Sequence, residues 1–153
     1  LFDGTDNFLK CSTFTFTPPV SIYCFFNKVA QQAGQTRLFD GNTINTGTWF
    51  FDAAAMTSNL YNGSAVLGPT GVVVAGQYNA VCAVINGTSS AIRIGDTSVT
   101  GDIGAATAMA GFTLGASGAP NEYGNVQVKE VILYSGAHDD GTQSKIINYL
   151  TRL

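Results

Sequence analysis

Apolar residues gather in short stretches along most of this chain, and turn-forming residues separate them. Short runs with alternating or β-branched apolar residues, bounded by Gly, Pro, Asn and Asp, are typical of β-strands. The pattern predicts strands at Val20–Asn27, Arg37–Asp40, Thr48–Asp52, Asn59–Tyr61, Gly71–Ala75, Ala80–Ile85, Ala91–Gly95, Gly111–Ala116 and Val126–Tyr134, with short pieces near Phe2, Leu9 and Val99.

The run Val20–Asn27 is apolar on both of its faces. Ile22, Cys24 and Phe26 alternate with Tyr23 and Phe25. Successive side chains of a strand point to opposite sides of the sheet. We therefore expect this strand to lie in the middle of a sheet that is covered on both sides.

Helical spacing is found at the C-terminus. From Thr142 on, Ile146, Ile147, Leu150 and Leu153 recur at intervals that place them on one helix face. The preceding Asp residues supply acceptors for the first turn of such a helix. About a dozen short strands closed by one short helix predict an all-β domain, a two-sheet antiparallel β-sandwich or jelly roll, over residues 1–153.

Composition narrows the function classes. Of the 153 residues, 45% are hydrophobic and only 11% are charged, with a net charge of −3. Lys and Arg form no cluster, so we expect no nucleic-acid partner. No apolar run reaches the ~20 residues that span a bilayer, so we expect no membrane span. The chain begins in mid-pattern at Leu1, and we expect it to be the C-terminal part of a longer protein.

The three cysteines are an odd number. Cys24 and Cys82 fall within strand patterns, and Cys11 lies near the N-terminal turn. We expect all three to be small buried hydrophobic residues rather than a disulfide framework.

Several segments resemble concanavalin A-like lectin and glucanase domains, in particular their laminin-G-like branch. The resemblance rests on FDGTDNFL near the start, AVINGTSSAIRIGDT at Ala83–Thr97, and GFTLGA, GNVQVKEVILYSG and IINYL near the end. PPVSIYCFF after the first hairpin is similar to the form found in virion proteins of tailed bacteriophages. The resemblance implies a concanavalin A-like sandwich on a particle surface, as a capsid decoration, head fibre or tail fibre.

Catalytic chemistry finds little support in the residues. The hydrolases of that superfamily carry an E-x-D-x-x-E strand motif, and neither Glu122 nor Glu130 lies in one. Glu130 shares a strand face with Val128 and Ile132, so we expect it to point inward and to be satisfied by Arg93 or Lys10. His138, the only histidine, has no nucleophile motif near it. We expect no enzymatic activity.

Sugar binding requires exposed aromatic rings beside side chains that hydrogen-bond hydroxyl groups. The candidates are Trp49, Tyr61, Asn62, Asn121, Glu122 and Tyr123. Trp49 has an alternative interpretation as a core residue, because it stands beside Phe50 and Phe51.

Calcium is the one cofactor considered. Laminin-G-like domains can hold Ca²⁺ at the rim of the sandwich, and Asp96 and Asp102 are the residues that could do so here. The alternative is two solvated loop carboxylates.

Three functions follow, in order of preference. The first is a non-enzymatic module on a virion surface, outside the cell, that contacts other virion proteins, is oligomeric in the particle and binds glycans for host attachment. The second is a purely structural virion protein that packs on a capsid or fibre partner and has no ligand. The third is a glycan hydrolase, which would need two facing carboxylates.

Overall fold

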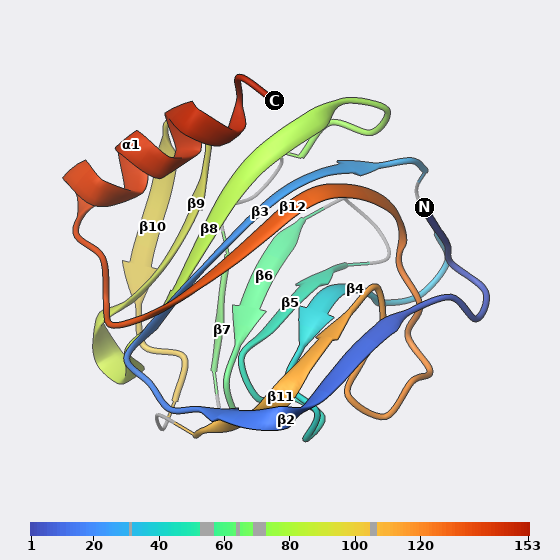
Figure 1. Cartoon of the computed structure of the whole chain (residues 1–153), viewed down its shortest axis with the longest axis horizontal. Helices are drawn as coiled ribbons and strands as arrows, with labels where there is room; N and C mark the ends of the chain where they lie inside the picture. Colours follow the sequence, from blue (N-terminus) through green and yellow to red (C-terminus); the bar gives the residue numbers. More distant parts are fainter. Residues whose placement is uncertain (31, 53–56, 64, 69–72, 105–106) are drawn as a thin grey trace.

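Two antiparallel sheets pack face to face to form the protein (Figure 1). The computed structural model describes residues 1–30, 32–52, 57–63, 65–68, 73–104 and 107–153. Over this part of the chain the fold is the predicted all-β sandwich with a short helix at the C-terminal end.

The first sheet contains the predicted central strand and carries the helix on its outer face. Its strands, in spatial order, are β1 (Phe2–Asp3), β12 (Asn125–Ser135), β3 (Val20–Lys28), β8 (Tyr78–Ile85), β9 (Ser90–Ile94) and β10 (Thr97–Gly101). The predicted Asn86-Gly87 hairpin joins β8 to β9 and includes a 3-10 turn (Gly87–Ser89).

The second sheet faces the first across the core. Its strands, in spatial order, are β2 (Leu9–Phe16), β11 (Met109–Leu114), β4 (Thr36–Asp40), β5 (Thr48–Phe51), β6 (Ser58–Tyr61) and β7 (Val66–Leu67).

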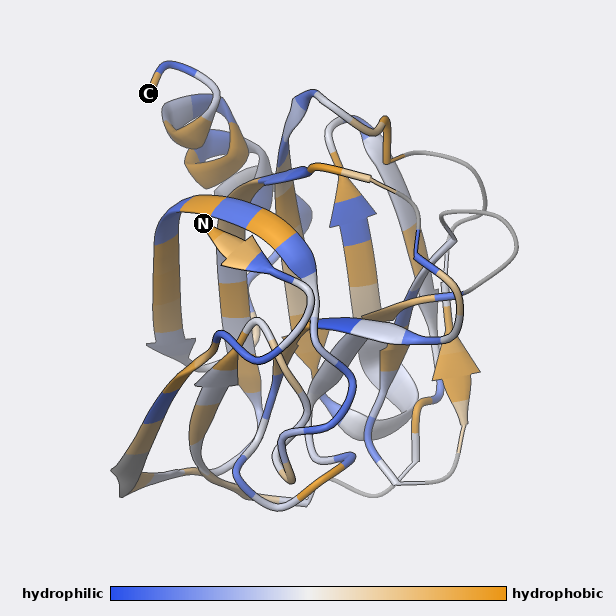
Figure 2. Ribbon diagram, turned by 90° about the vertical axis from the view of Figure 1, so that its right-hand side faces the viewer, coloured by the Kyte–Doolittle hydropathy of each residue, from blue (hydrophilic) through white to orange (hydrophobic). Residues whose placement is uncertain are grey.

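Aromatic and branched side chains from both sheets fill the space between them. Phe26 of the first sheet meets Phe51 of the second, with ring centroids 5.6 Å apart. The ring centroids of Phe39 and Trp49 lie 6.0 Å apart. In Figure 2, hydrophobic (orange) and more polar segments alternate along several strands, which is the pattern of strands with one face on a core.

The outer face of β3 explains why this strand is apolar on both sides. Tyr23 and Phe25 point away from the sandwich core and pack under helix α1 (Asp140–Leu150). Ile147 and Leu150 cover them from the helix, which lies along the first sheet in Figure 1.

Polar contacts fix the start of α1. The Asp139 side chain accepts a hydrogen bond from the Thr142 amide at 2.7 Å, which caps the helix. Arg93 of β9 donates to Gln143, Ser144 and Asp140. The helix begins at Asp140, two residues before the predicted start at Thr142. Leu153, which the spacing placed on the helix face, lies beyond the end of the helix and is exposed.

Two strand predictions need correction. The N-terminal piece near Leu9 extends to Phe16 and forms the full edge strand β2. Of the predicted strand at 71–75, residues 71 and 72 lie outside the described residues, and Val73–Ala75 form no strand. Sheet pairing next to β6 is made instead by Val66 and Leu67.

The expected inward orientation of Glu130 is also wrong. A bulge between Val128 and Glu130 shifts the register of β12 against β3, and Glu130 pairs with Phe25 on the helix-covered face. One extra residue turns all following side chains to the other face of a strand. The two partners expected for Glu130 make other contacts. Arg93 donates a hydrogen bond to Gln143 of α1, and the Lys10 amine donates to the Gly118 carbonyl.

The cysteines agree with the prediction in part. Cys24 and Cys82 are buried in β3 and β8, whereas Cys11 on the edge strand β2 is exposed. Among the described helices, none is long and apolar enough to cross a membrane.

Candidate functional site

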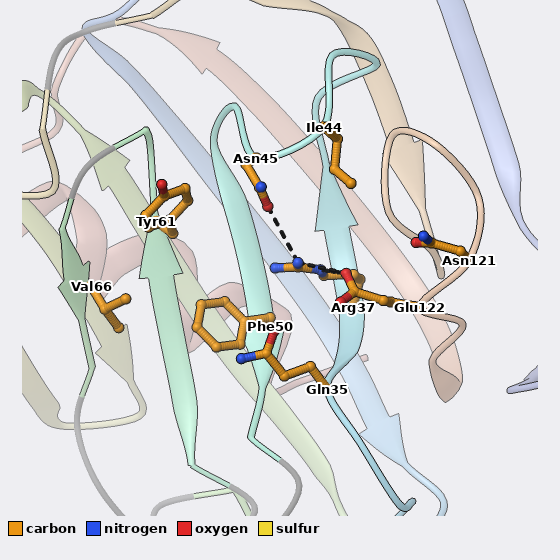
Figure 3. Close-up of a pocket in the computed structure, with 9 residues that line it drawn as sticks. All are labelled: Gln35, Arg37, Ile44, Asn45, Phe50, Tyr61, Val66, Asn121 and Glu122. Carbon is orange, nitrogen blue, oxygen red and sulfur yellow. Dashed lines mark hydrogen bonds and ion pairs between the residues drawn. The ribbon is translucent and has the colours of Figure 1, made fainter.

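A pocket of about 340 Å³ lies on the outer face of the second sheet, away from α1 (Figure 3). Nine side chains from four strands, the segment before β4, one turn and one loop surround it. They are Gln35, Arg37, Ile44, Asn45, Phe50, Tyr61, Val66, Asn121 and Glu122.

Strand register brings the floor residues together. Arg37 of β4 pairs with Phe50 of β5, and Tyr61 of β6 pairs with Val66 of β7. Their strand neighbours, such as Trp49, fill the core on the other side. The floor therefore consists of one guanidinium group between aromatic and aliphatic side chains.

The rim comes from two segments distant in sequence. The β4–β5 turn supplies Ile44 and Asn45, and the loop between β11 and β12 supplies Asn121 and Glu122. In Figure 3 these side chains converge on the pocket from its upper and right-hand sides.

An ion pair joins the floor to the rim. Arg37 Nη2 lies 2.5 Å from Glu122 Oε2, and Arg37 Nε donates to the same oxygen at 2.6 Å. The two side chains are 6% and 28% exposed. The guanidinium also lies 5.0 Å from the centre of the Phe50 ring, within the range of a cation–π contact. The pair is thus partly desolvated and well ordered by its neighbours.

Asn45 is oriented by the same arginine. Arg37 Nη2 donates to Asn45 Oδ1 at 3.3 Å. An arginine has donors but no acceptor, so the amide oxygen of Asn45 must face it and the amide NH₂ must point elsewhere. Asn45 itself has a φ of 67°, a left-handed conformation that Asn tolerates better than most residues.

Asp40 anchors both rim segments from behind. Its fully buried carboxylate accepts hydrogen bonds from the backbone N–H of Asn45 at 3.1 Å, from the backbone N–H of Gly118 at 2.9 Å and from the Thr48 hydroxyl. Burial raises the pKa of Asp40, while these donors and the nearby charge of Arg37 act to lower it. One buried acid therefore sets the position of the turn and of the loop.

Glycines allow the loop to reach the strand. A Cβ at Gly124 would stand 2.2 Å from the Arg37 carbonyl oxygen, and one at Gly118 would stand 2.2 Å from the Gly41 carbonyl oxygen. Neither position has room for a side chain. This close approach lets the Arg37 amide donate to the Glu122 carbonyl at 3.1 Å.

Three of the six predicted sugar-contacting residues lie in this pocket: Tyr61, Asn121 and Glu122. Tyr61 is partly exposed, and its neighbours across the pocket lie sixty residues later in the sequence. The structure brings these three together, as a common site requires.

The other three lie elsewhere. Trp49 is fully buried in the core, so no ligand can reach its ring. Asn62 is fully buried as well and accepts a hydrogen bond from the Gly47 amide at 2.9 Å. Tyr123 donates to the Pro120 carbonyl and packs beside Phe8. The structure supports none of the three as a ligand contact in this pocket.

Sequence reasoning missed the remaining lining residues, although two left a signal. Arg37 precedes Leu38 in β4, so it must face outward once Leu38 faces the core. Phe50 alternates with Trp49 and Phe51, so it must face outward once those two face the core.

The two predicted calcium ligands are far apart. Asp96 precedes β10 and Asp102 follows it, so about 20 Å of extended chain separates them at about 3.3 Å per residue. Asp102 accepts a hydrogen bond from the Gly104 amide. The two carboxylates cannot bind one ion, and the described residues contain no group of three or more potential metal ligands of the His, Cys, Asp and Glu types.

No protein-family model and no curated protein sequence matches this chain. Solved structures do. A Trypanosoma rangeli sialidase in complex with the inhibitor DANA superposes with a TM-score of 0.65 at 14% identity, over 84% of this chain and 22% of the sialidase. The NanB sialidase of Streptococcus pneumoniae superposes with a TM-score of 0.67 at 11% identity, over 94% of this chain and 27% of the sialidase.

The CBM40 domain of the Ruminococcus gnavus IT-sialidase, solved with bound alpha2,3 sialyllactose, superposes with a TM-score of 0.65 at 11% identity. That match covers 86% of this chain and 83% of the CBM40 chain. The chain thus spans about a quarter of the length of the sialidases but most of the isolated domain. At these identities the likeness concerns the fold, a β-sandwich compatible with the concanavalin A-like architecture.

Proposed function

We propose that this domain is a non-enzymatic carbohydrate-binding module and that the pocket on the second sheet is its binding site. The observation that carries the proposal is the combination of Tyr61 and Phe50 with the amide groups of Asn45 and Asn121 in one hollow. Aromatic rings pack against the apolar face of a sugar ring, while amides hydrogen-bond its hydroxyl groups.

The size of the pocket agrees with such a ligand. At about 340 Å³ it lies near the lower end of the range of ligand pockets, roughly 300–1,000 Å³. It accommodates one or two sugar rings rather than a long chain. The sandwich fold shared with a CBM40 domain that binds alpha2,3 sialyllactose also favours a glycan ligand.

The absence of enzymatic activity is part of the proposal. Most glycosidases use two carboxyl groups that face each other across the scissile bond. Glu122 is the one carboxylate among the described lining residues, and Arg37 neutralises it. Asp40 lies behind the floor, fully buried and held by three donors. This arrangement favours binding over hydrolysis.

We further propose that the module acts outside the cell on a bacteriophage virion, together with other virion proteins. The proposal rests on the resemblance of PPVSIYCFF and NGTSSAIRIGDT to phage laminin-G-like domains and on the low content of charged residues. Antibodies against the domain should label intact particles. Labelling that requires disrupted particles would contradict a surface location.

The alternative is a structural role without a ligand. A groove of about 260 Å³ between β2 and β12 is lined almost entirely by apolar side chains, among them Leu9, Leu114 and Leu133. Both flanking strands have unpaired edge positions in the described sheets, which favours an extended strand of a virion neighbour as the occupant. Loss of particle incorporation in Leu9→Glu, together with no glycan binding by the wild-type domain, would support this role in place of the first.

A Tyr61→Ala variant tests the pocket. We expect its affinity for any glycan that the wild-type domain binds on an array to fall at least tenfold, about 1.4 kcal/mol, because the ring supplies the stacking surface. Isothermal titration calorimetry measures the change. Tyr149→Ala, which removes an exposed tyrosine from α1 on the other sheet, is the matched control and should bind as the wild type does. No binding to any glycan would refute the proposed function.

A further inference from the structure

The charges of the pocket cancel each other. Arg37 and Glu122 are the charged side chains among the described lining residues, and they form an ion pair at 2.5 Å. Both Nε and Nη2 of the guanidinium point at Glu122, and Nη2 also reaches Asn45. A carboxylate on a ligand would therefore have to compete with a carboxylate that is already in place.

The surroundings add negative rather than positive charge. Asp40 lies at the end of the same strand as Arg37, close enough for the guanidinium charge to act on its carboxyl. The amine of Lys10 is directed at the Gly118 carbonyl and does not line the pocket. An anion in the pocket would meet one cation that is already paired with Glu122.

We infer that the pocket selects neutral sugars and that Glu122 is the residue that excludes acidic ones. The inference rests on the proposed glycan-binding function and specifies its ligand class. The groups left to contact a ligand are uncharged: the amides of Gln35, Asn45 and Asn121 and the hydroxyl of Tyr61. They match the hydroxyl groups of an uncharged hexose, and they differ from what the sialyllactose-binding CBM40 domain would suggest by analogy of fold.

Replacement of Glu122 by Gln isolates this charge. The substitution keeps the size of the side chain and an oxygen that accepts from Arg37, but it removes the negative charge. The loop is also held through the backbone, since the Glu122 carbonyl accepts from the Arg37 amide. The variant should fold, and its Arg37 charge becomes available to an anionic ligand.

The experiment compares neutral sugars with acidic counterparts. Methyl glycosides of glucose and galactose, their glucuronide and galacturonide counterparts, and neutral and sialylated lactose are titrated into the wild type and into Glu122→Gln. In the wild type, the neutral member of each pair that binds should bind at least tenfold more tightly. In Glu122→Gln, that preference should fall at least tenfold or reverse, and added salt should weaken the acidic sugars most.

Glu130→Gln on β12 is the matched control, because it makes the same chemical change outside the pocket and should leave the preference unchanged. Tighter binding of the acidic sugars by the wild type, or an unchanged preference in Glu122→Gln, overturns the inference but leaves the glycan-binding function standing. Absence of binding to these sugars and to every glycan on an array overturns the glycan-binding function itself, and the inference with it.

Discussion

At the scale of single residues, buried polar groups decide the shape of the pocket. Asp40 receives hydrogen bonds from β5, from the β4–β5 turn and from the β11–β12 loop. Each buried donor that loses its acceptor costs about 1–3 kcal/mol. A single carboxylate thus couples the β4–β5 turn and the start of β5 to a loop that lies 78 residues away in the sequence.

Two substitutions at Asp40 should have very different effects. Asp40→Ala leaves three buried donors without an acceptor, and we expect it to lower the free energy of unfolding by about 3 kcal/mol or more. In Asp40→Asn, the amide oxygen can still accept from the Asn45 and Gly118 amides, and its NH₂ can donate to the Thr48 hydroxyl. Burial already raises the pKa of Asp40 and so disfavours its charged form. We therefore expect Asp40→Asn to lower the free energy of unfolding by less than about 1 kcal/mol.

Urea denaturation followed by circular dichroism measures both changes. Equal destabilisation by the two variants would mean that the negative charge itself, rather than the hydrogen-bond pattern, is required.

At the scale of elements, α1 and the pocket lie on opposite outer faces of the sandwich. The helix is held by Ile147 and Leu150 on the first sheet, whereas the pocket is built on the second. In the described part of the chain, the packed core lies between the two faces. Stability and ligand binding should therefore be separable by substitutions in the helix.

Leu150→Ala tests this separation. Leu150 is fully buried between the helix and the first sheet, so its truncation should lower the free energy of unfolding by about 2–4 kcal/mol. Glycan affinity under conditions where the domain stays folded should not change. Denaturation and calorimetry on the same preparation report both quantities, with Tyr149→Ala as an exposed control from the same turn. A loss of affinity in folded Leu150→Ala would show that the helix acts on the pocket.

At the scale of the whole molecule, one buried cation links the two sheets. Lys28, at the end of β3, donates to Thr36 of β4 at 3.1 Å, and its amine lies 4.4 Å above the Phe51 ring of β5. Burial lowers the pKa of Lys28 from 10.5 to about 8. Between pH 8 and 10.5 the unfolded chain binds this proton and the folded chain does not, so Lys28 contributes stability that increases as pH rises.

Other buried groups act in the opposite direction at higher pH. Burial raises the pKa of Cys82 from 9.0 to about 12 and also raises the pKa of Cys24 and Tyr23. Above pH 9 the unfolded chain loses these protons first, which lowers stability. A comparison of two variants that share these groups removes their contribution.

We predict that the stability difference between the wild type and Lys28→Met shifts in favour of the wild type by about 1 kcal/mol from pH 7 to pH 9. Denaturant midpoints at pH 7, 8 and 9 give this difference. A difference that stays constant with pH would show that Lys28 keeps an ordinary pKa in the folded protein.

Much of this architecture could be predicted from local patterns. The doubly apolar run Val20–Asn27 predicted a central strand with a cover on its outer face, and β3 under α1 is that strand. The acidic N-terminus and spacing of the last segment predicted the helix. These features depend on neighbours within a few positions, which is the range over which strand and helix periodicity act.

The pocket required the tertiary structure. Alternation placed Trp49 and Phe50 on opposite faces of β5, but it did not determine which face was buried, and Trp49 proved to be the core residue. The bulge before Glu130 reversed a strand face in the same way. The ion pair between Arg37 and Glu122 depends on the register of the second sheet and on the β11–β12 loop, whose glycines allow it to pack closely against β4.

Local periodicity and burial were enough to predict the β-sandwich, its central strand and its closing helix. Long-range packing was needed to establish which aromatic ring faces outward, which acid meets the arginine, and that Asp96 and Asp102 cannot share an ion. Those outcomes depend on the registry of segments tens of residues apart, where a shift of one residue moves a side chain to the opposite face.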